Sequence, residues 1–200
     1  MNIPDFLGYL GTFVFAITGA MKARTHKMDI IGGLVLAFVT AYGGGTLRDL
    51  LIGVRPVNWV NDPVPLGFIV AATLLTFLLR DNLLLFRRFI FYTDAIGLGL
   101  FTAAGMEISF RHGLIPIYAL IMGVISATFG GLVADVLSNT VPSILKKGEF
   151  YVTACGLGGA CYLGLRYFSF SDDIMLLVCV LVVVGSRIIS KRNRLHLPEI

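Results

Sequence analysis

Residues 41–51 of the chain read AYGGGTLRDLL, and residues 127–137 read ATFGGLVADVL. The two stretches align without a gap at an offset of 86 residues. Each is followed by a proline at the same distance, Pro56 after the first and Pro142 after the second. A run of glycines that precedes an aspartate is therefore present twice in this sequence.

The similarity extends well beyond this motif. At the same offset, 13 of 66 positions are identical between residues 15–80 and residues 101–166. The matches include Gly, Asp, Pro, His and Arg, which a shared apolar bias alone would not align. We interpret the chain as two repeats, at about residues 5–82 and about residues 91–168, within a single transmembrane domain.

Both repeats consist of apolar segments with the length that a bilayer requires. Hydrophobic residues make up 56% of the 200 residues and charged residues only 14%, whereas about a quarter of a soluble domain is charged. Seven segments have at most one charge and approach the roughly 17–25 residues of a membrane span: 6–21, 30–47, 63–79, 89–106, 113–134, 150–165 and 174–189. Only the fourth and the seventh are interrupted by a charge, Asp94 and Arg187. A large soluble helical protein is the alternative, but no charged amphipathic helix is present to cover its core.

We therefore predict an all-α membrane protein of seven transmembrane helices. Three spans per repeat is an odd number, so the second repeat enters the membrane from the opposite face. The expected architecture is two inverted three-helix repeats, related by a pseudo-two-fold axis in the membrane plane. The seventh helix, at about residues 174–190, lies outside the repeats.

The basic residues predict the orientation of the chain. With the N-terminus outside, twelve of the sixteen Lys and Arg residues fall on the cytoplasmic side, as the positive-inside rule requires. They are Lys22, Arg24, Lys27, Arg80, Arg87, Arg88, Lys146, Lys147, Arg187, Lys191, Arg192 and Arg194, against Arg48, Arg55, Arg111 and Arg166 outside. This distribution explains the net charge of +4 without a nucleic-acid partner. The basic tail serves as a topology anchor or binds anionic lipid.

The glycine runs point to a pathway through the membrane. A glycine inside a helix costs about 1 kcal/mol relative to alanine, and Gly43, Gly44 and Gly45 in succession should bend or open their span. Opened backbone is tolerated in a membrane only inside the protein or along a wet cavity. Broken helices at matching places in two inverted halves indicate a translocation site. The alternative is that the glycines only let helices pack closely.

Two carboxylates accompany the glycines. An ionisable group within a membrane helix costs around 2.5–3.5 kcal/mol and normally faces a partner or water. We expect Asp49 and Asp135 to approach the pseudo-two-fold axis from opposite faces, and Arg48 to pair with one of them as a gate or tether. Two acids and one base would form a net negative site for a transient monovalent cation. Four hydroxyls on the same segments add oxygens: Thr40, Thr46, Ser126 and Ser138. The alternative is that both acids only cap helix ends.

Other chemistry finds little support in the sequence. Cys155, Cys161 and Cys179 lie in apolar segments without CxxC spacing, so they are predicted to be packing residues. The glycine run lacks the GK[ST] ending of a phosphate-binding loop. We predict no enzymatic activity, no cofactor and no resident metal.

The doubled motif resembles the prokaryotic TRIC family, the trimeric intracellular cation channels. The resemblance covers essentially the whole chain. It implies a homotrimer in the inner (plasma) membrane of a prokaryote, in contact with membrane lipids, with one pore per subunit that conducts monovalent cations, chiefly potassium. The second and fifth spans would line this pore, with the residues Gly43, Gly44, Gly45, Arg48, Asp49, Gly130, Gly131 and Asp135. Phe129 stands where a symmetrical third glycine would lie.

Two other functions remain open at this stage. A secondary transporter for a small zwitterion such as glycine would use an aspartate for the ammonium and Arg48 for the carboxylate, and bacterial relatives are associated with amino-acid uptake. A membrane assembly or scaffold protein explains the apolar spans but not the doubled motif. Arg48 discriminates between the first two functions, because a channel needs it at most as a gate.

Overall fold

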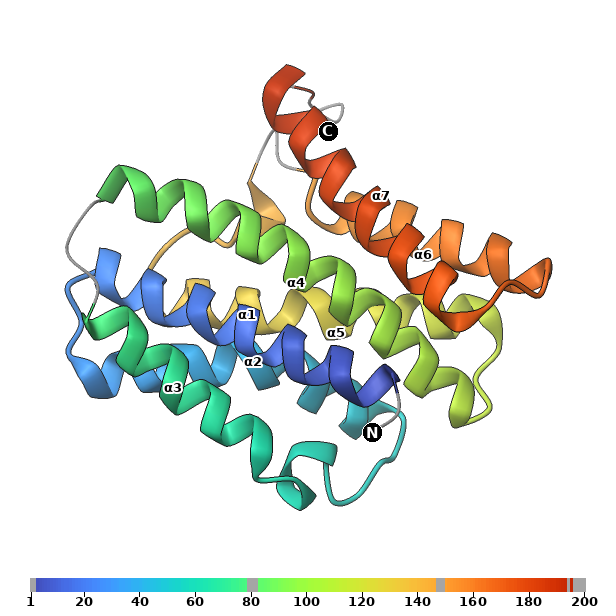
Figure 1. Ribbon diagram of the computed structural model, residues 1–200, viewed down its shortest axis with the longest axis horizontal. Helices are drawn as coiled ribbons and strands as arrows, with labels where there is room; N and C mark the ends of the chain where they lie inside the picture. The colour runs from blue at the N-terminus through green and yellow to red at the C-terminus, as the bar shows by residue number, and fades with distance from the viewer. Residues whose placement is uncertain (1–2, 79–82, 147–149, 194, 196–200) are drawn as a thin grey trace.

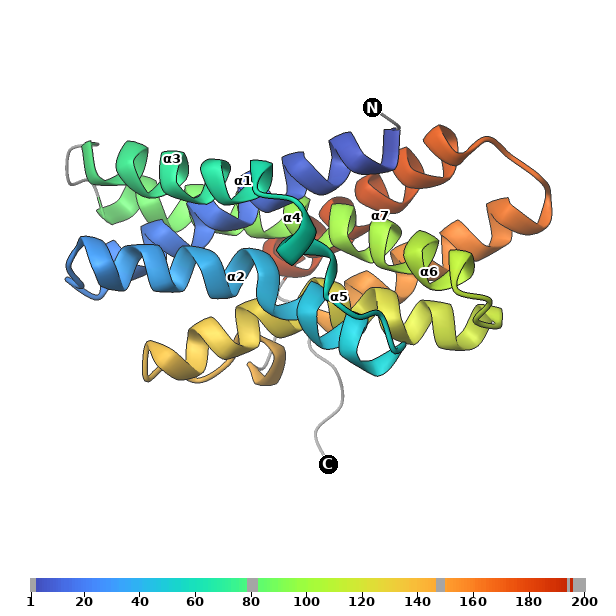
Figure 2. The ribbon, with the colours of Figure 1, turned by 90° about the horizontal axis from the view of Figure 1, so that it is seen from below.

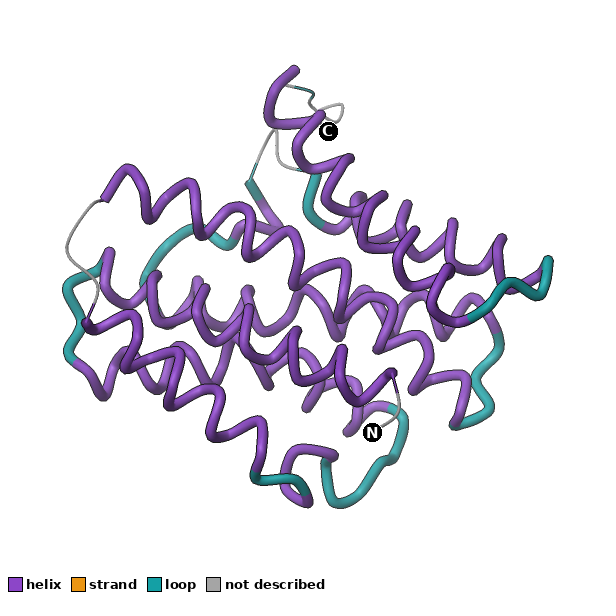
Figure 3. Tube along the Cα trace, in the orientation of Figure 1, coloured by secondary structure: helices purple, strands orange, loops and turns teal. Residues whose placement is uncertain are grey.

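The computed structural model describes residues 3–78, 83–146, 150–193 and 195, without the side chains of 3–7 and 83–87. This part of the chain is all-helical, as predicted (Figure 1, Figure 3). Its helices are α1 (Ile3–Thr25), α2 (Ile30–Leu51), α3 (Val64–Leu78), α4 (Leu83–Arg111), α5 (Pro116–Leu137), α6 (Val152–Tyr167) and α7 (Asp172–Asn193). Short 3-10 turns, η1 (Asn58–Asn61) and η2 (Ser143–Leu145), follow α2 and α5. Each apolar segment of the sequence corresponds to one α-helix.

The helices differ in how well their length and composition suit a membrane. Among the described residues, four helices are long and apolar enough to cross one: α2, α5, α7 and the part of α4 from Arg88 to Arg111. Helix α3 is apolar but has only 15 residues. The observed helix ends also differ from the predicted segments. For example, α4 continues past its apolar stretch to Arg111.

Alanine is frequent inside the bundle, and many large apolar residues lie on its surface. The buried core is rich in alanine, and Ala16, Ala37 and Ala127 are fully buried. On the outside, Leu78 is 79% exposed and Leu181 is 61% exposed. In water this arrangement would be unfavourable, whereas in a bilayer small residues let helices approach and large ones face lipid. The chain is a multi-pass membrane protein by this criterion.

Four helices form the centre of the molecule, and the other three cover it. Helices α1, α2, α4 and α5 pack against one another, with α3 against α1 and α2 and with α6 against α4 and α5. Helix α7 packs on α4 and α6. Figure 2 shows α2 and α5 next to each other on one side of the bundle. The positions of α3 and α6 correspond under the 86-residue offset of the sequence.

Backbone details recur at this same offset, even where the residues differ. Lys27 and Gly113 both have a positive φ, of 55° and 77°, in the turns after α1 and α4. The turns after α2 and α5 contain another such pair, Gly53 at 80° and Asn139 at 51°. Glycine and asparagine tolerate this left-handed conformation best.

One pair of matched residues meets inside the bundle. The rings of Phe15 on α1 and Phe101 on α4 stack with their centroids 5.0 Å apart and an angle of 12° between their planes. Both rings belong to the buried core. The first and fourth helices therefore contact each other through equivalent positions.

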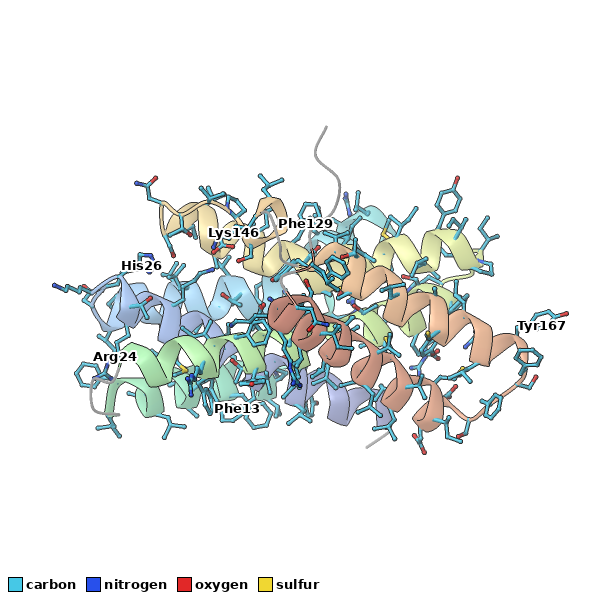
Figure 4. The ribbon with its side chains drawn as sticks, turned by 90° about the horizontal axis from the view of Figure 1, so that it is seen from above. Phe13, Arg24, His26, Phe129, Lys146 and Tyr167 are labelled. Atoms are coloured by element: carbon cyan, nitrogen blue, oxygen red, sulfur yellow. The ribbon has the colours of Figure 1, made fainter. Side chains whose placement is uncertain are left out.

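The two ends of the bundle carry different side chains. Figure 4 shows Arg24, His26 and Lys146 toward one end and Tyr167 at the opposite end. Arg24 and Lys146 belong to the set that the sequence predicts on the cytoplasmic side. Four members of that set, Arg80, Lys147, Arg194 and the side chain of Arg87, lie outside the described residues.

Candidate functional site

Helices α2 and α5 contact each other directly at their glycines. A Cβ atom on Gly44 would overlap the carbonyl oxygen of Ser126, and one on Gly130 would overlap the carbonyl oxygen of Thr40. A Cβ on Gly43 would lie 3.2 Å from the Cα of Gly130. Gly44 and Gly130 are equivalent positions of the repeat, as are Thr40 and Ser126. The crossing is therefore a reciprocal contact of two backbones, which any larger side chain would separate.

Of the two effects expected of the glycines, a bend or an opening of the helix, the opening is absent. Helix α2 runs without interruption from Ile30 to Leu51, and α5 runs likewise from Pro116 to Leu137. The glycines instead permit the close approach of α2 and α5, which is the packing role considered as an alternative. The last glycines of the two runs face polar groups, because the nearest atoms are Arg48 Nη2 for Gly45 and Tyr151 Oη for Gly131.

Two cavities extend from this crossing toward opposite ends of the bundle. The first, which we call the Asp49 cavity, has a volume of about 520 Å³. It is lined by the N-terminal part of α1, the C-terminal part of α4 and the end of α2 with the η1 turn. The second, the Asp135 cavity, has a volume of about 500 Å³. It is lined by the C-terminal parts of α1, α5 and α7 and the N-terminal part of α4.

A barrier at the crossing of α2 and α5 separates the two cavities, which have neighbouring residues of α2 in their linings. Thr40 lines the Asp135 cavity, whereas the next residue, Ala41, lines the Asp49 cavity. The matched glycines are divided in the same way, since Gly45 lines the Asp49 cavity and Gly131 lines the Asp135 cavity. A continuous path between the two cavities would pass the crossing of α2 and α5.

Arg48 forms the polar contact at this barrier. Its Nη2 and Nε donate to Oδ1 of Asp49 over 2.7 Å and 3.0 Å, and its Nη1 donates to Ser126 Oγ over 3.0 Å. Arg48 is 4% exposed and Asp49 is 1% exposed, so this ion pair is removed from bulk water. Asp49 also accepts the backbone N–H of Asn58 over 2.9 Å, which fixes the turn after α2. Arg48 thus pairs with an aspartate, as expected, and its hydrogen bond to Ser126 joins α2 to α5.

Asp135 has a different basic partner, Lys22 from α1. Its Oδ2 accepts the backbone N–H of Ser143 over 2.7 Å, as Asp49 does in the other repeat, and Oδ1 accepts from Thr140 over 3.2 Å. Lys22 is predicted by the sequence only to anchor the topology. The structure instead places its ammonium group in the cavity, against the carboxylate.

The expected net negative site does not form. Asp49 and Asp135 line separate cavities, and each is neutralised by its own basic residue. The Asp135 cavity is in fact lined by more basic than acidic side chains: Lys22, Lys146, Arg187 and Lys191 against Asp94 and Asp135. Both acids also bind the turn after their helix, so the capping role is part of what they do.

The four predicted hydroxyls have distinct surroundings. Thr40 donates to the carbonyl of Leu36 over 2.6 Å and lines the Asp135 cavity, and Ser126 accepts from Arg48. Thr46 accepts a hydrogen bond of 2.9 Å from the indole of Trp59. Ser138 is buried and donates to the carbonyl of Ala134 over 2.8 Å, so it serves the end of α5 and does not line either cavity.

Sequence reasoning missed a second buried ion pair. Asp94 on α4 pairs with Arg187 on α7, and it also accepts a hydrogen bond of 3.2 Å from Tyr151. The guanidinium of Arg187 lies 4.8 Å from the centroid of the Tyr151 ring. The signal was available, because a charge within an apolar span usually has a function or a partner.

Across the described ranges, no group of three or more His, Cys, Asp and Glu side chains could hold a metal ion. Cys155, Cys161 and Cys179 are free thiols.

A family model described as glycine transporter matches the chain twice, at residues 5–81 and 91–167. The two matches are displaced by 86 residues, as the motifs are. Among curated proteins, the UPF0126 inner membrane protein YadS of Escherichia coli is 37% identical over 195 residues, which cover 96% of this chain and 94% of YadS.

Solved structures resemble the whole chain. The TRIC trimeric intracellular cation channel orthologue from Rhodobacter sphaeroides is 34% identical, with a TM-score of 0.86 and coverage of 96% of this chain and 100% of that one. A structure that explains conductance through TRIC cation channels is 36% identical, with a TM-score of 0.81 and coverage of 100% and 98%.

Proposed function

Because this chain belongs to the prokaryotic TRIC family, we propose that it is a potassium-permeable cation channel with a pore in each subunit of a homotrimer. The pore would be lined by α2 and α5, both kinked at the glycines where the two helices cross. Its path would follow the Asp49 cavity, pass the crossing and continue through the Asp135 cavity.

The observation that carries this proposal is the position of the two cavities on either side of the crossing of α2 and α5. Adjacent residues of α2, Thr40 and Ala41, line opposite cavities. A pathway of this shape opens when α2 and α5 separate slightly or when Arg48 moves. The structure corresponds to a closed state in this proposal, since Arg48 and the glycine contact both occupy the crossing.

The proposed architecture has two inverted repeats, at about residues 5–82 and 91–168, and an extra helix at about 174–190. The matched φ angles, the stacked Phe15 and Phe101 and the reciprocal contacts of Gly44 and Gly130 support it. Crossing of all seven helices and placement in the inner membrane also belong to the proposal.

We expect an N-terminus outside and a C-terminus in the cytoplasm. The asymmetry of Lys and Arg motivates this orientation. A reporter that is fluorescent only in the cytoplasm, fused after Ile200, should be active, and a periplasmic phosphatase fused there should be silent. The opposite pattern would mean that the orientation or the number of spans is wrong.

Flux into liposomes that contain only this protein tests the function itself. We expect a potassium flux that exceeds the flux of protein-free liposomes. This flux should follow the potassium gradient alone, without a gradient of glycine. The same vesicles should not accumulate labelled glycine in a saturable manner. Saturable glycine accumulation without potassium permeability would overturn the channel proposal.

A glycine transporter is the second candidate, and one geometric observation favours it besides the name of the family model. The guanidinium of Arg48 and the carboxylate of Asp62 line the same cavity, where a zwitterion would find both charges. Arg48 is nevertheless already bound to Asp49, which reduces its capacity for a substrate carboxylate. The channel therefore remains the better supported proposal.

A further inference from the structure

The Asp49 cavity contains a carboxylate that the proposed pathway does not use. Asp62, after the η1 turn, lines the cavity and is half-buried. Its Oδ2 accepts a hydrogen bond of 2.6 Å from the hydroxyl of Tyr9, and its Oδ1 accepts the backbone N–H of Val64 over 3.0 Å. Neither donor is a cation. Within the described residues, Asp62 forms no ion pair, in contrast to Asp49 and Asp135.

A second polar group of the same cavity has no partner. Tyr42 lines the cavity and is only 7% exposed, and in the described part of the chain its hydroxyl makes no hydrogen bond. A buried hydroxyl without a partner costs free energy, so such groups usually await a ligand or water. Asp62 and Tyr42 come from segments 20 residues apart in sequence, yet they line one space.

The wall between these two groups is aromatic. The Trp59 ring stacks on the Tyr42 ring at a centroid distance of 5.3 Å, and the indole N–H is held by Thr46 at 2.9 Å. Tyr9 contributes a third ring to the cavity lining. Aromatic faces attract cations and also pack against alkyl groups.

We propose that the Asp49 cavity contains a binding site for a small primary alkylammonium ion. The ammonium would donate hydrogen bonds to the carboxylate of Asp62 and the hydroxyl of Tyr42, and its alkyl group would pack against Trp59. Three N–H donors match an acid and a hydroxyl better than a spherical ion does, because their directions are fixed. Arg48 is not part of this site, so the ligand needs no carboxylate group.

This site lies in the pathway of the proposed channel, but its occupation does not depend on conduction. A binding measurement therefore separates the two proposals. Trp59 is the only tryptophan of the chain, so its emission reports directly on the wall of this cavity. Saturation-transfer NMR provides a second measurement that suits weak ligands.

The test is a titration of the full-length protein in detergent with ethylammonium chloride, with sodium chloride at equal ionic strength as the reference. We expect a saturable change of Trp59 emission and transfer of magnetisation to the ethyl protons. Asp62→Asn should weaken binding about tenfold or more, because it removes the counter-charge of the ammonium. Asp173→Asn, which changes an exposed acid at the start of α7, is the matched control and should bind as the original protein does.

Two comparisons define the chemistry of the site. Tyr42→Phe should weaken ethylammonium more than tetramethylammonium, because the latter has no N–H to donate. Glycine should bind no more tightly than ethylammonium.

Three results would overturn the proposal. They are no saturable signal by either method, equal binding by the Asp62 and Asp173 variants, or a clear preference for glycine, which would assign the cavity to a zwitterion. The binding test is independent of the measurement of potassium flux in liposomes. A protein that binds ethylammonium but does not conduct potassium would refute only the channel proposal.

Discussion

Replacing Gly44 with alanine should remove most of the potassium flux, whereas the same change at its neighbour Gly45 should leave the flux close to that of the original protein. The sequence presents the two glycines as equivalent members of one run. The structure distinguishes them, because a Cβ on Gly44 would overlap the Ser126 carbonyl of α5. The nearest atom to a Cβ on Gly45 is Nη2 of Arg48, at 3.7 Å, which is an ordinary contact.

The size of the effect follows from the rigidity of the contact. A carbonyl oxygen in the middle of α5 cannot rotate away as a side chain would, so α2 and α5 must move apart. Overpacking of this kind typically costs about 1–3 kcal/mol. A cost of this size corresponds to a change of about 5- to 150-fold in the population of the correctly packed state. Gly130→Ala should behave like Gly44→Ala, since it would overlap the Thr40 carbonyl.

The measurement is potassium flux in liposomes, normalised to the amount of assembled protein from size-exclusion chromatography. Gly45→Ala is the matched control, because it adds the same methyl group one residue away. Equal flux of the Gly44 and Gly45 variants, at equal assembly, would show that the crossing does not control permeation. Failure of the Gly44 variant to assemble would assign the contact to folding, and flux of the Gly131→Ala variant would then test the pathway separately.

Much of the fold could be predicted from the sequence, because membrane spans are recognised by their apolar composition and repeats by the constant spacing of matched residues. The apolar segment at 63–79 predicted α3 at Val64–Leu78. The turns that share a backbone conformation in the structure are related by the same offset of 86 residues, even the unlike pair Lys27 and Gly113. The ends of α4 were missed because a helix continues beyond its apolar stretch into the polar region.

The candidate site was less accessible, since a sequence indicates which residues are unusual but not which ones meet. Asp135 was identified, yet its partner Lys22 lies 113 positions away on α1 and looked like a topology signal. Asp94 and Arg187 appeared as separate interruptions of two spans, although they pair. The sequence draws attention to the glycines, but their contacts depend on the backbone of another helix, which no local pattern reveals.

The charges at the crossing should act in opposite directions, with Arg48→Ala raising potassium flux and Asp49→Asn lowering it. Arg48 is buried at the barrier and donates to Ser126 of α5, so its removal eliminates both a positive charge and a tie between α2 and α5. A positive charge about 4 Å from a permeating cation opposes it by about 4 kcal/mol at an effective dielectric constant of about 20. Even a part of this energy changes flux more than tenfold.

Asp49→Asn should have the reverse effect because it leaves the Arg48 charge uncompensated at the barrier. By the same logic, Asp135→Asn should lower flux, since the ammonium of Lys22 would then face the pathway alone. Removing one member of a buried pair can also destabilise the protein, by about 3–5 kcal/mol. The double variant Arg48→Ala with Asp49→Asn removes both charges and should assemble normally, with a flux above that of Asp49→Asn.

Arg111→Ala is the matched control for Arg48→Ala. Both arginines line the Asp49 cavity, but Arg111 is exposed and forms its ion pair with Glu107, one helical turn away. Its charge is screened by water, so its removal should change the potassium flux little.

Measuring potassium and glycine fluxes of all these variants in one liposome preparation also separates the two candidate functions. A carrier that binds a carboxylate through Arg48 loses glycine uptake in the Arg48 variant while its potassium flux stays the same. Loss of potassium flux in that variant, with normal flux in Asp49→Asn and Asp135→Asn, would contradict the roles assigned to the three residues.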